Sequence, residues 1–114
     1  MGYTVDTLVE ALRDEPETMW VRLVAHWLTA GELSPVPAAP AGSMVADALV
    51  AAAVAMRART LGESAPGWTS DQTRVLAEQW HPGPDAMFAW SLEHAPAEFR
   101  DRGLIVEGDS LQSV

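Results

Sequence analysis

The sequence predicts an all-α protein, a single compact bundle of five to six helices with a short extended C-terminal segment. Apolar residues recur at helical spacing near the start of the chain, and capping residues, glycines and prolines interrupt the rest at short intervals. The composition, 48% hydrophobic and 20% charged, is that of a globular chain. With 114 residues, we expect a single helical domain over 1–114.

The first two expected helices have the clearest periodicity. Over 4–13, apolar residues lie at i, i+3, i+4 and i+7, namely Val5, Leu8, Val9 and Leu12. Over 17–30, after Pro16, a second apolar stripe contains Trp20, Leu23, Val24, Trp27 and Leu28. Gly31 then fits a helix C-cap.

A proline-rich internal loop, 32–42, separates these helices from the third. Its sequence, E-L-S-P-V-P-A-A-P-A-G, favours extended backbone. Ser43 can cap a helix over 43–61, with Gly62 as its stop. That helix is apolar nearly all round, which predicts a buried central helix, although its alanines could instead form a dimer seam.

The capping-box pattern Thr69-Ser70-Asp71-Gln72 predicts a fourth helix over 70–80. Its expected buried residues are Val75, Leu76 and Trp80. The stretch H-P-G-P ends that helix and begins the next.

Two shorter helices are expected after this, over 85–94 and 97–102, the second ended by Gly103. Phe88 and Leu92 lie four residues apart on the first of them. Residues 104–106, Leu-Ile-Val, are expected to be extended, and 109–111 to form a final turn.

Charge and residue usage restrict the possible functions. Seven arginines face sixteen acidic residues, and the net charge of −9 disfavours direct nucleic-acid binding. The same charge suits a partner with a basic surface, or equally serves solubility alone. The absence of cysteine excludes disulfides and thiolate metal sites. The N-terminal residues lack a secretory signal and no stretch suits a membrane span, so a cytoplasmic protein is expected.

No pattern in the sequence assembles catalytic chemistry. The three histidines fall on different expected elements, and no serine sits in G-x-S-x-G. No glycine-rich phosphate loop is present. We therefore expect no enzymatic activity, no metal and no cofactor.

Aromatic residues are the better candidates for contact with a partner, because tryptophan is common at binding hot spots. Trp20 and Trp27 share a core stripe, whereas Trp68, Trp80 and Trp90 flank turns or lie on short helices. The extended run 104–106 could also pair with a partner's strand.

The C-terminal half carries the motifs W-T-x-D, W-H-P, W-x-L-x-x-A-P-x-x-F-R-x-R-G-L-I-V and D-S-L-x-S-V. From about Ala58 onward the chain resembles small helical antitoxin-like proteins of actinobacteria. The resemblance implies a noncatalytic protein that binds a toxin encoded nearby and masks its active site. Its conspicuous positions are Phe99, Arg100, Arg102, Gly103, Leu104 and Ile105.

The function expected from the sequence is therefore a noncatalytic acidic protein-binding module that neutralises a basic partner, like an antitoxin or immunity protein. The predicted contact residues are Trp80, Trp90, Phe99, Arg100, Arg102, Leu104, Ile105 and Val106. Two alternatives stay open: a helical small-molecule-binding domain with tryptophans around a pocket, and a self-associating scaffold such as a homodimer. A transcription-associated module is disfavoured, since the arginines are scattered along the chain.

Overall fold

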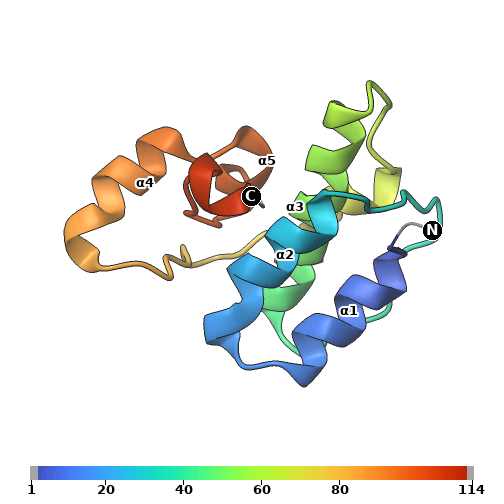
Figure 1. Cartoon of the computed structure of the whole chain (residues 1–114), viewed down its shortest axis with the longest axis horizontal. Coiled ribbons are helices and arrows are strands. Elements are labelled where there is room, and N and C mark those ends of the chain that lie inside the picture. The colour runs from blue at the N-terminus through green and yellow to red at the C-terminus, as the bar shows by residue number, and fades with distance from the viewer. Residues whose placement is uncertain (1–2, 113–114) are drawn as a thin grey trace.

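The computed structural model describes residues 3–112 and is all-α (Figure 1). Its α-helices are α1 (Val5–Asp14), α2 (Trp20–Leu28), α3 (Met44–Thr60), α4 (Phe88–His94) and α5 (Ala97–Arg100). Five 3₁₀ turns lie between or beside them: η1 (Glu17–Met19), η2 (Gly67–Ser70), η3 (Gln72–Arg74), η4 (Asp85–Met87) and η5 (Gly108–Leu111). None of the described helices is long and apolar enough to cross a membrane.

Helices α1, α2 and α3 pack against one another and supply most of the core. The Thr4 hydroxyl accepts the Thr7 N–H at 3.2 Å and so begins α1 at its expected position. Pro16 precedes η1, which leads directly into α2. The apolar stripes face inward as predicted, since the buried residues of the two helices include Val5, Leu8, Val9, Leu12, Trp20, Val24 and Trp27.

Helix α3 is the buried centre that its composition predicts. The Ser43 hydroxyl accepts the Ala46 N–H at 3.3 Å, and Gly62 follows the helix with a φ of +70°. The buried residues are Ala46, Ala48, Leu49, Val50, Ala51, Ala52, Ala53, Val54, Ala55 and Ala58. These are the residues that would form a dimer seam, and the chain covers them with its own elements.

Gly31 is not the predicted C-cap of α2. The helix ends at Leu28, and Gly31 instead pairs with Tyr3 in an isolated parallel bridge. A Cβ at this position would lie 2.6 Å from the Trp27 ring. The glycine is therefore required by close approach of the backbone to an indole.

The predicted helix over 70–80 is wrong. The Thr69 hydroxyl donates to Pro66 O at 2.7 Å, and Asp71, which is extended, separates η2 from η3. Beyond η3 the backbone amides bond distant carbonyls: Leu76 N–H to Arg102 O at 3.0 Å and Trp80 N–H to Gly103 O at 2.8 Å. These tertiary hydrogen bonds replace the helical ones that the capping box suggested. Of the residues expected to be buried here, Val75 is 41% exposed and the other two are half-buried.

The proline-rich loop 32–42 is fixed to the rest of the fold by side chains from other elements. The Trp68 indole donates to Ser34 O at 2.8 Å. The Arg74 guanidinium, which is buried, donates to Ala38 O at 2.9 Å and lies over the Trp68 ring. Ala38 itself is buried. The loop is therefore anchored to the core at Ala38 and Ala41, while most of its other residues are exposed.

The chain's last third produces α4, α5 and η5 near their expected positions. Helix α5 packs on α3, whereas α4 projects at one end of the molecule (Figure 1). At 104–106 the described chain has no strand, only an isolated bridge between Leu104 and Trp80. Gly103 precedes this bridge with a φ of +81°, a conformation that favours glycine.

Candidate functional site

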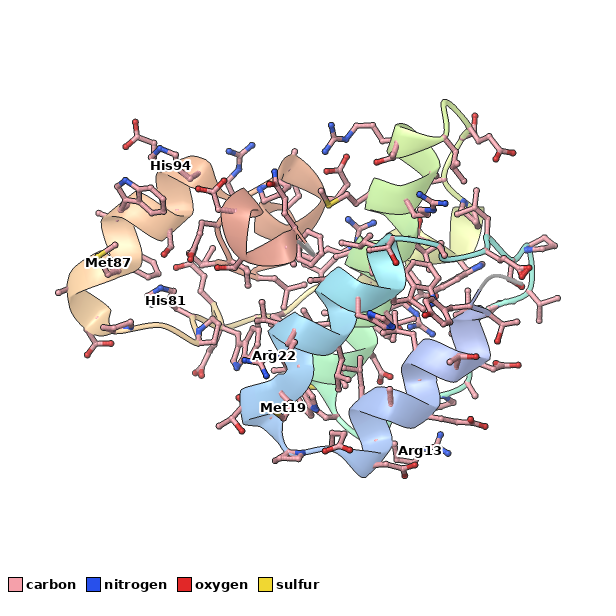
Figure 2. All side chains as sticks on the ribbon, in the orientation of Figure 1. Arg13, Met19, Arg22, His81, Met87 and His94 are labelled. Atoms are coloured by element: carbon pink, nitrogen blue, oxygen red, sulfur yellow. The ribbon has the colours of Figure 1, made fainter. Side chains whose placement is uncertain are left out.

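The projecting helix α4, together with the last residue of η4, presents an exposed face made of Met87, Trp90 and His94, which we call the α4 face. Met87 is 45% exposed, Trp90 is 41% exposed, and His94 is exposed as well. Trp90 and His94, four residues apart, lie on one side of α4, and Met87 is the N-cap residue of this helix. Figure 2 shows Met87 and His94 along the outer part of α4. Large apolar side chains grouped in this way mark contact surfaces more often than isolated ones do.

Trp90 and His94 form a fixed pair on this face. Their rings stack with centroids 4.0 Å apart and an angle of 18° between the planes. The Nδ1 atom of His94 lies 2.8 Å from Trp90 O, and it must carry a proton because a carbonyl oxygen only accepts. The hydrogen bond orients the His94 ring, and stacking on that ring favours one orientation of the indole, which lowers the entropy cost of binding.

A polar cluster of His81, Ser91, Glu107 and Ser110 holds α4 to the C-terminal turn. Ser91, buried on the inner side of α4, lies 3.2 Å from His81 Nε2 and donates to Glu107 at 3.0 Å. Ser110 donates to the other Glu107 oxygen at 2.5 Å. The hydrogen bond from Ser110 is the main reason that the pKa of Glu107 is lowered, with a smaller contribution from Ser91. In Figure 2, His81 lies on the chain segment beside α4.

The polar cluster has the residue types of a nucleophilic triad but not its connectivity. In such a triad the histidine lies between the serine and the carboxylate and takes the serine proton. Here Ser91 lies between His81 and Glu107, and its hydroxyl donates to the carboxylate. With Ser91 only 2% exposed, its oxygen is not accessible to a substrate. The arrangement links segments of the chain together.

Replacing Ser91 with alanine should loosen α4 while leaving the core intact. The substitution removes the hydroxyl that joins His81 and Glu107, at an expected cost of about 1–2 kcal/mol. Hydrogen exchange should show faster exchange of the amides over 85–94 and unchanged protection over 46–58.

The pH dependence of the free energy of unfolding provides a control for this expectation. Because the folded state lowers the pKa of Glu107 below its usual 4.5, the carboxylate's contribution to stability is complete above that pH. It is lost as the pH falls through the lower, folded-state pKa. The stability difference between wild type and Ser91→Ala should therefore shrink below about pH 4.5. A constant difference would contradict a role for the Ser91–Glu107 hydrogen bond.

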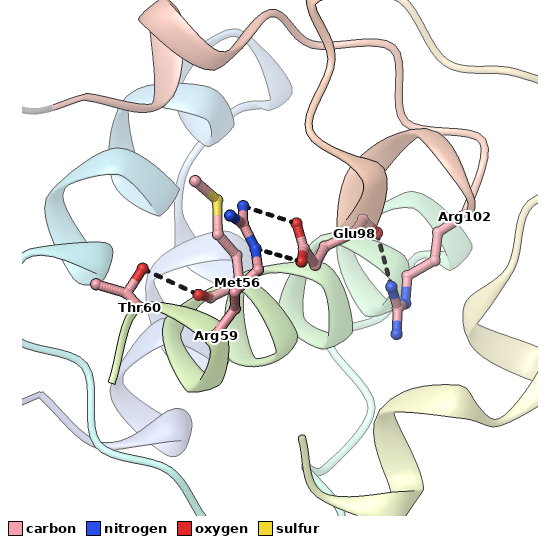
Figure 3. Close-up of polar contacts among 5 residues, drawn as sticks. All are labelled: Met56, Arg59, Thr60, Glu98 and Arg102. Atoms are coloured by element: carbon pink, nitrogen blue, oxygen red, sulfur yellow. Dashed lines mark hydrogen bonds and ion pairs between the residues drawn. The ribbon is translucent and has the colours of Figure 1, made fainter. Parts of the chain in front are cut away.

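Most of the arginine side chains form hydrogen bonds or ion pairs with other groups of the protein. Arg13, Arg57, Arg74 and Arg102 all donate to backbone carbonyls. Arg59 forms a bidentate pair with Glu98, at 2.7 and 3.1 Å (Figure 3). This hydrogen-bonded pairing raises the pKa of Arg59. Partial burial acts to raise the pKa of Glu98, but the hydrogen bond from Arg59, a backbone hydrogen bond and the charges of Arg59 and Arg102 together lower it.

The acidic residues, in contrast, mostly face solvent. All of them except Asp47, Glu98 and Glu107 are exposed. Over residues 3–112, Glu98 and Asp101 alone lie within 4.0 Å of an arginine nitrogen. The negative charge is therefore a property of the outer surface, and Asp85 and Glu93 place part of it beside the α4 face.

The predicted contact residues fall into two groups. Trp90 and Arg100 are exposed, and Trp80 is half-buried with its indole donating to Glu17. The others belong to the interior. Arg102 donates to Glu98 O and to Thr69 O, and its pKa is lowered by burial. Four more are buried in the core, and this leaves them no surface to offer to a partner: Phe99, Leu104, Ile105 and Val106.

Sequence reasoning missed Met87 and His94 as companions of Trp90. Their helical spacing on an already expected helix was the signal that could have found them. The polar cluster had no such signal, since its members come from three separated parts of the chain. Within the described residues, no group of three or more potential ligand side chains is placed to hold a metal ion.

The fold and this surface define a class: an all-α, acidic protein with an exposed aromatic helix face. Comparisons with known proteins do not narrow it, because no family model, no curated protein and no solved structure matches the chain. The resemblance of residues 58–114 to antitoxin-like proteins stays a prediction.

Proposed function

We propose that the protein is a noncatalytic binding module that neutralises a basic protein partner, as an antitoxin or immunity protein does. The observation that carries this proposal is a partial segregation of charge: four of the seven arginines donate to backbone carbonyls of the protein, while thirteen of the sixteen acidic residues face solvent. Complementary potentials of this kind accelerate encounter and reject wrong partners.

The α4 face is the proposed centre of the contact. Trp90 offers a large, orientationally fixed aromatic surface, and Met87 adds an adaptable apolar one. The nearby carboxylates of Asp85 and Glu93 suit lysine or arginine side chains around an apolar centre. A bundle of five or six helices with an extended C-terminal segment is not required, because the contact uses one projecting helix.

The test is capture of the partner by purified protein, with Trp90→Ala as the matched variant. Trp90 is exposed, so its loss should change the free energy of unfolding by no more than about 0.5–1 kcal/mol. We expect wild type to retain one basic protein, and the variant to bind that protein at least about 30-fold more weakly by calorimetry. Affinity should also fall as salt screens the acidic surface.

A control separates the α4 face from general acidity. Glu10→Gln removes an exposed carboxylate from α1, away from the α4 face, and should change affinity only slightly. Equal binding by wild type and Trp90→Ala would exclude the α4 face as the contact. Capture of only acidic proteins would contradict the proposed charge complementarity.

A further inference from the structure

A small cavity lies between α1 and α2. Its volume is about 260 Å³, and its walls are mainly apolar. Leu8 and Trp27, both nearly fully buried, form its floor with Leu23 and Ala11 beside them. The Trp27 ring is held in place by its Nε1, which donates to Thr4 O at 2.9 Å. Apolar cavities of about 150 Å³ are known to hold a benzene-sized molecule, so this one has room for a substituted ring.

One rim of the cavity is polar. The Tyr3 hydroxyl and His26 Nε2 lie 2.9 Å apart, and both side chains line the cavity. When His26 donates its Nε2 proton to the Tyr3 oxygen, the phenolic hydroxyl becomes free to donate to a ligand. This pair can therefore offer a hydrogen bond to an acceptor at the mouth of the cavity.

A positive charge lies next to the same rim. Arg22 precedes His26 by one turn of α2 and lines an adjoining hollow of about 690 Å³. The hollow and the cavity share Leu23 and His26. Within residues 3–112, Arg22 is the one arginine whose side chain has neither a hydrogen bond to the protein nor a carboxylate within 4.0 Å. No acidic residue occupies the positions three or four away on its helix.

We infer that this cavity binds a small monocarboxylate with an apolar body, whose carboxylate meets Arg22 and the Tyr3–His26 pair. A single negative charge is favoured over a phosphate or a polyanion, since the molecule as a whole carries −9 and repels higher charges. The apolar body fills the space against Trp27 and Leu8. The site is separate from the α4 face and does not depend on the proposed function.

The test is the binding of benzoate and of its neutral analogue benzamide to the full chain. Binding is followed by NMR through the chemical shifts of the backbone amides. We expect benzoate to cause saturable shifts confined to the amides of α1 and α2, with benzamide binding more weakly. Arg22→Gln should weaken benzoate roughly three- to tenfold and leave benzamide unchanged, because it removes a charge from the rim and nothing from the cavity.

Two further variants complete the experiment. Ala11→Leu should fill the cavity and abolish binding of both molecules, and leucine suits a helical position well enough to keep α1 folded. Arg13→Gln, an exposed arginine on α1 outside the cavity, should leave both affinities unchanged. Unsaturable or dispersed shifts, or equal benzoate affinity in wild type and Arg22→Gln, would overturn the inference.

Discussion

Replacing Phe99 with alanine should destabilise the protein by about 3–5 kcal/mol, the range for removing a large aromatic side chain from a core. Phe99 is fully buried and belongs to the main hydrophobic cluster, at the point where α5 packs on α3. Small proteins are stable by only about 5–15 kcal/mol, so this change removes a large share of the free energy of unfolding. Urea unfolding followed by circular dichroism measures the change.

The neighbouring residue provides the control. Arg100 is exposed, and Arg100→Ala should alter stability by no more than about 0.5 kcal/mol. The contrast also separates two roles for this segment. A loss of partner binding in Phe99→Ala would be secondary to unfolding, whereas the same loss in Arg100→Ala would mark a direct contact. A cost below about 1 kcal/mol for Phe99→Ala would contradict the core position.

Replacing Arg74 with methionine should cost about 2–4 kcal/mol, although both side chains are long and flexible. Arg74 is 8% exposed and donates to Ala38 O at 2.9 Å and to Asp47 O at 3.1 Å. Methionine would leave both carbonyls without this donor, and a hydrogen bond to a charged group contributes about 1.5–3 kcal/mol. The release of guanidinium desolvation offsets part of the loss.

The effect should be visible in the proline-rich loop as well as in the global stability. Limited proteolysis of Arg74→Met should cut within 32–42 at a rate that wild type does not show. Arg13→Met is the matched control, since Arg13 donates to Pro40 O in the same loop but is exposed. It should cost less than about 1 kcal/mol. Equal losses of stability in the two variants would mean that burial of the Arg74 guanidinium does not contribute to the free energy of unfolding.

The parts of the fold that could be predicted are those decided by local pattern. Helices α1, α2 and α3 follow from apolar spacing and from caps such as Thr4 and Ser43, whose hydrogen bonds join residues three apart. The helix expected over 70–80 failed because its amides find partners more than twenty residues away, at Arg102 and Gly103. A pattern of neighbouring residues contains no information on such distant acceptors.

The candidate surface was predictable only in part. Trp90 could be selected because tryptophans near turns are often exposed, and the structure exposes it. The sequence does not assign the run Leu104, Ile105 and Val106 to the core, where the structure buries it. A short apolar run has the same sequence pattern in an exposed edge strand as in a buried segment. The burial of these three residues depends on the bridge to Trp80, which the expected helix would have excluded.

The outward placement of the carboxylates, in a chain without lysine, has a practical consequence for mapping a complex. Carbodiimide coupling joins a carboxyl group directly to an amine. Side chains of this protein supply only the carboxyl component, so the amine of each side-chain crosslink must come from the partner. Asp85 and Glu93 beside the α4 face would then report the lysines that approach it, without a background of lysine crosslinks inside this chain.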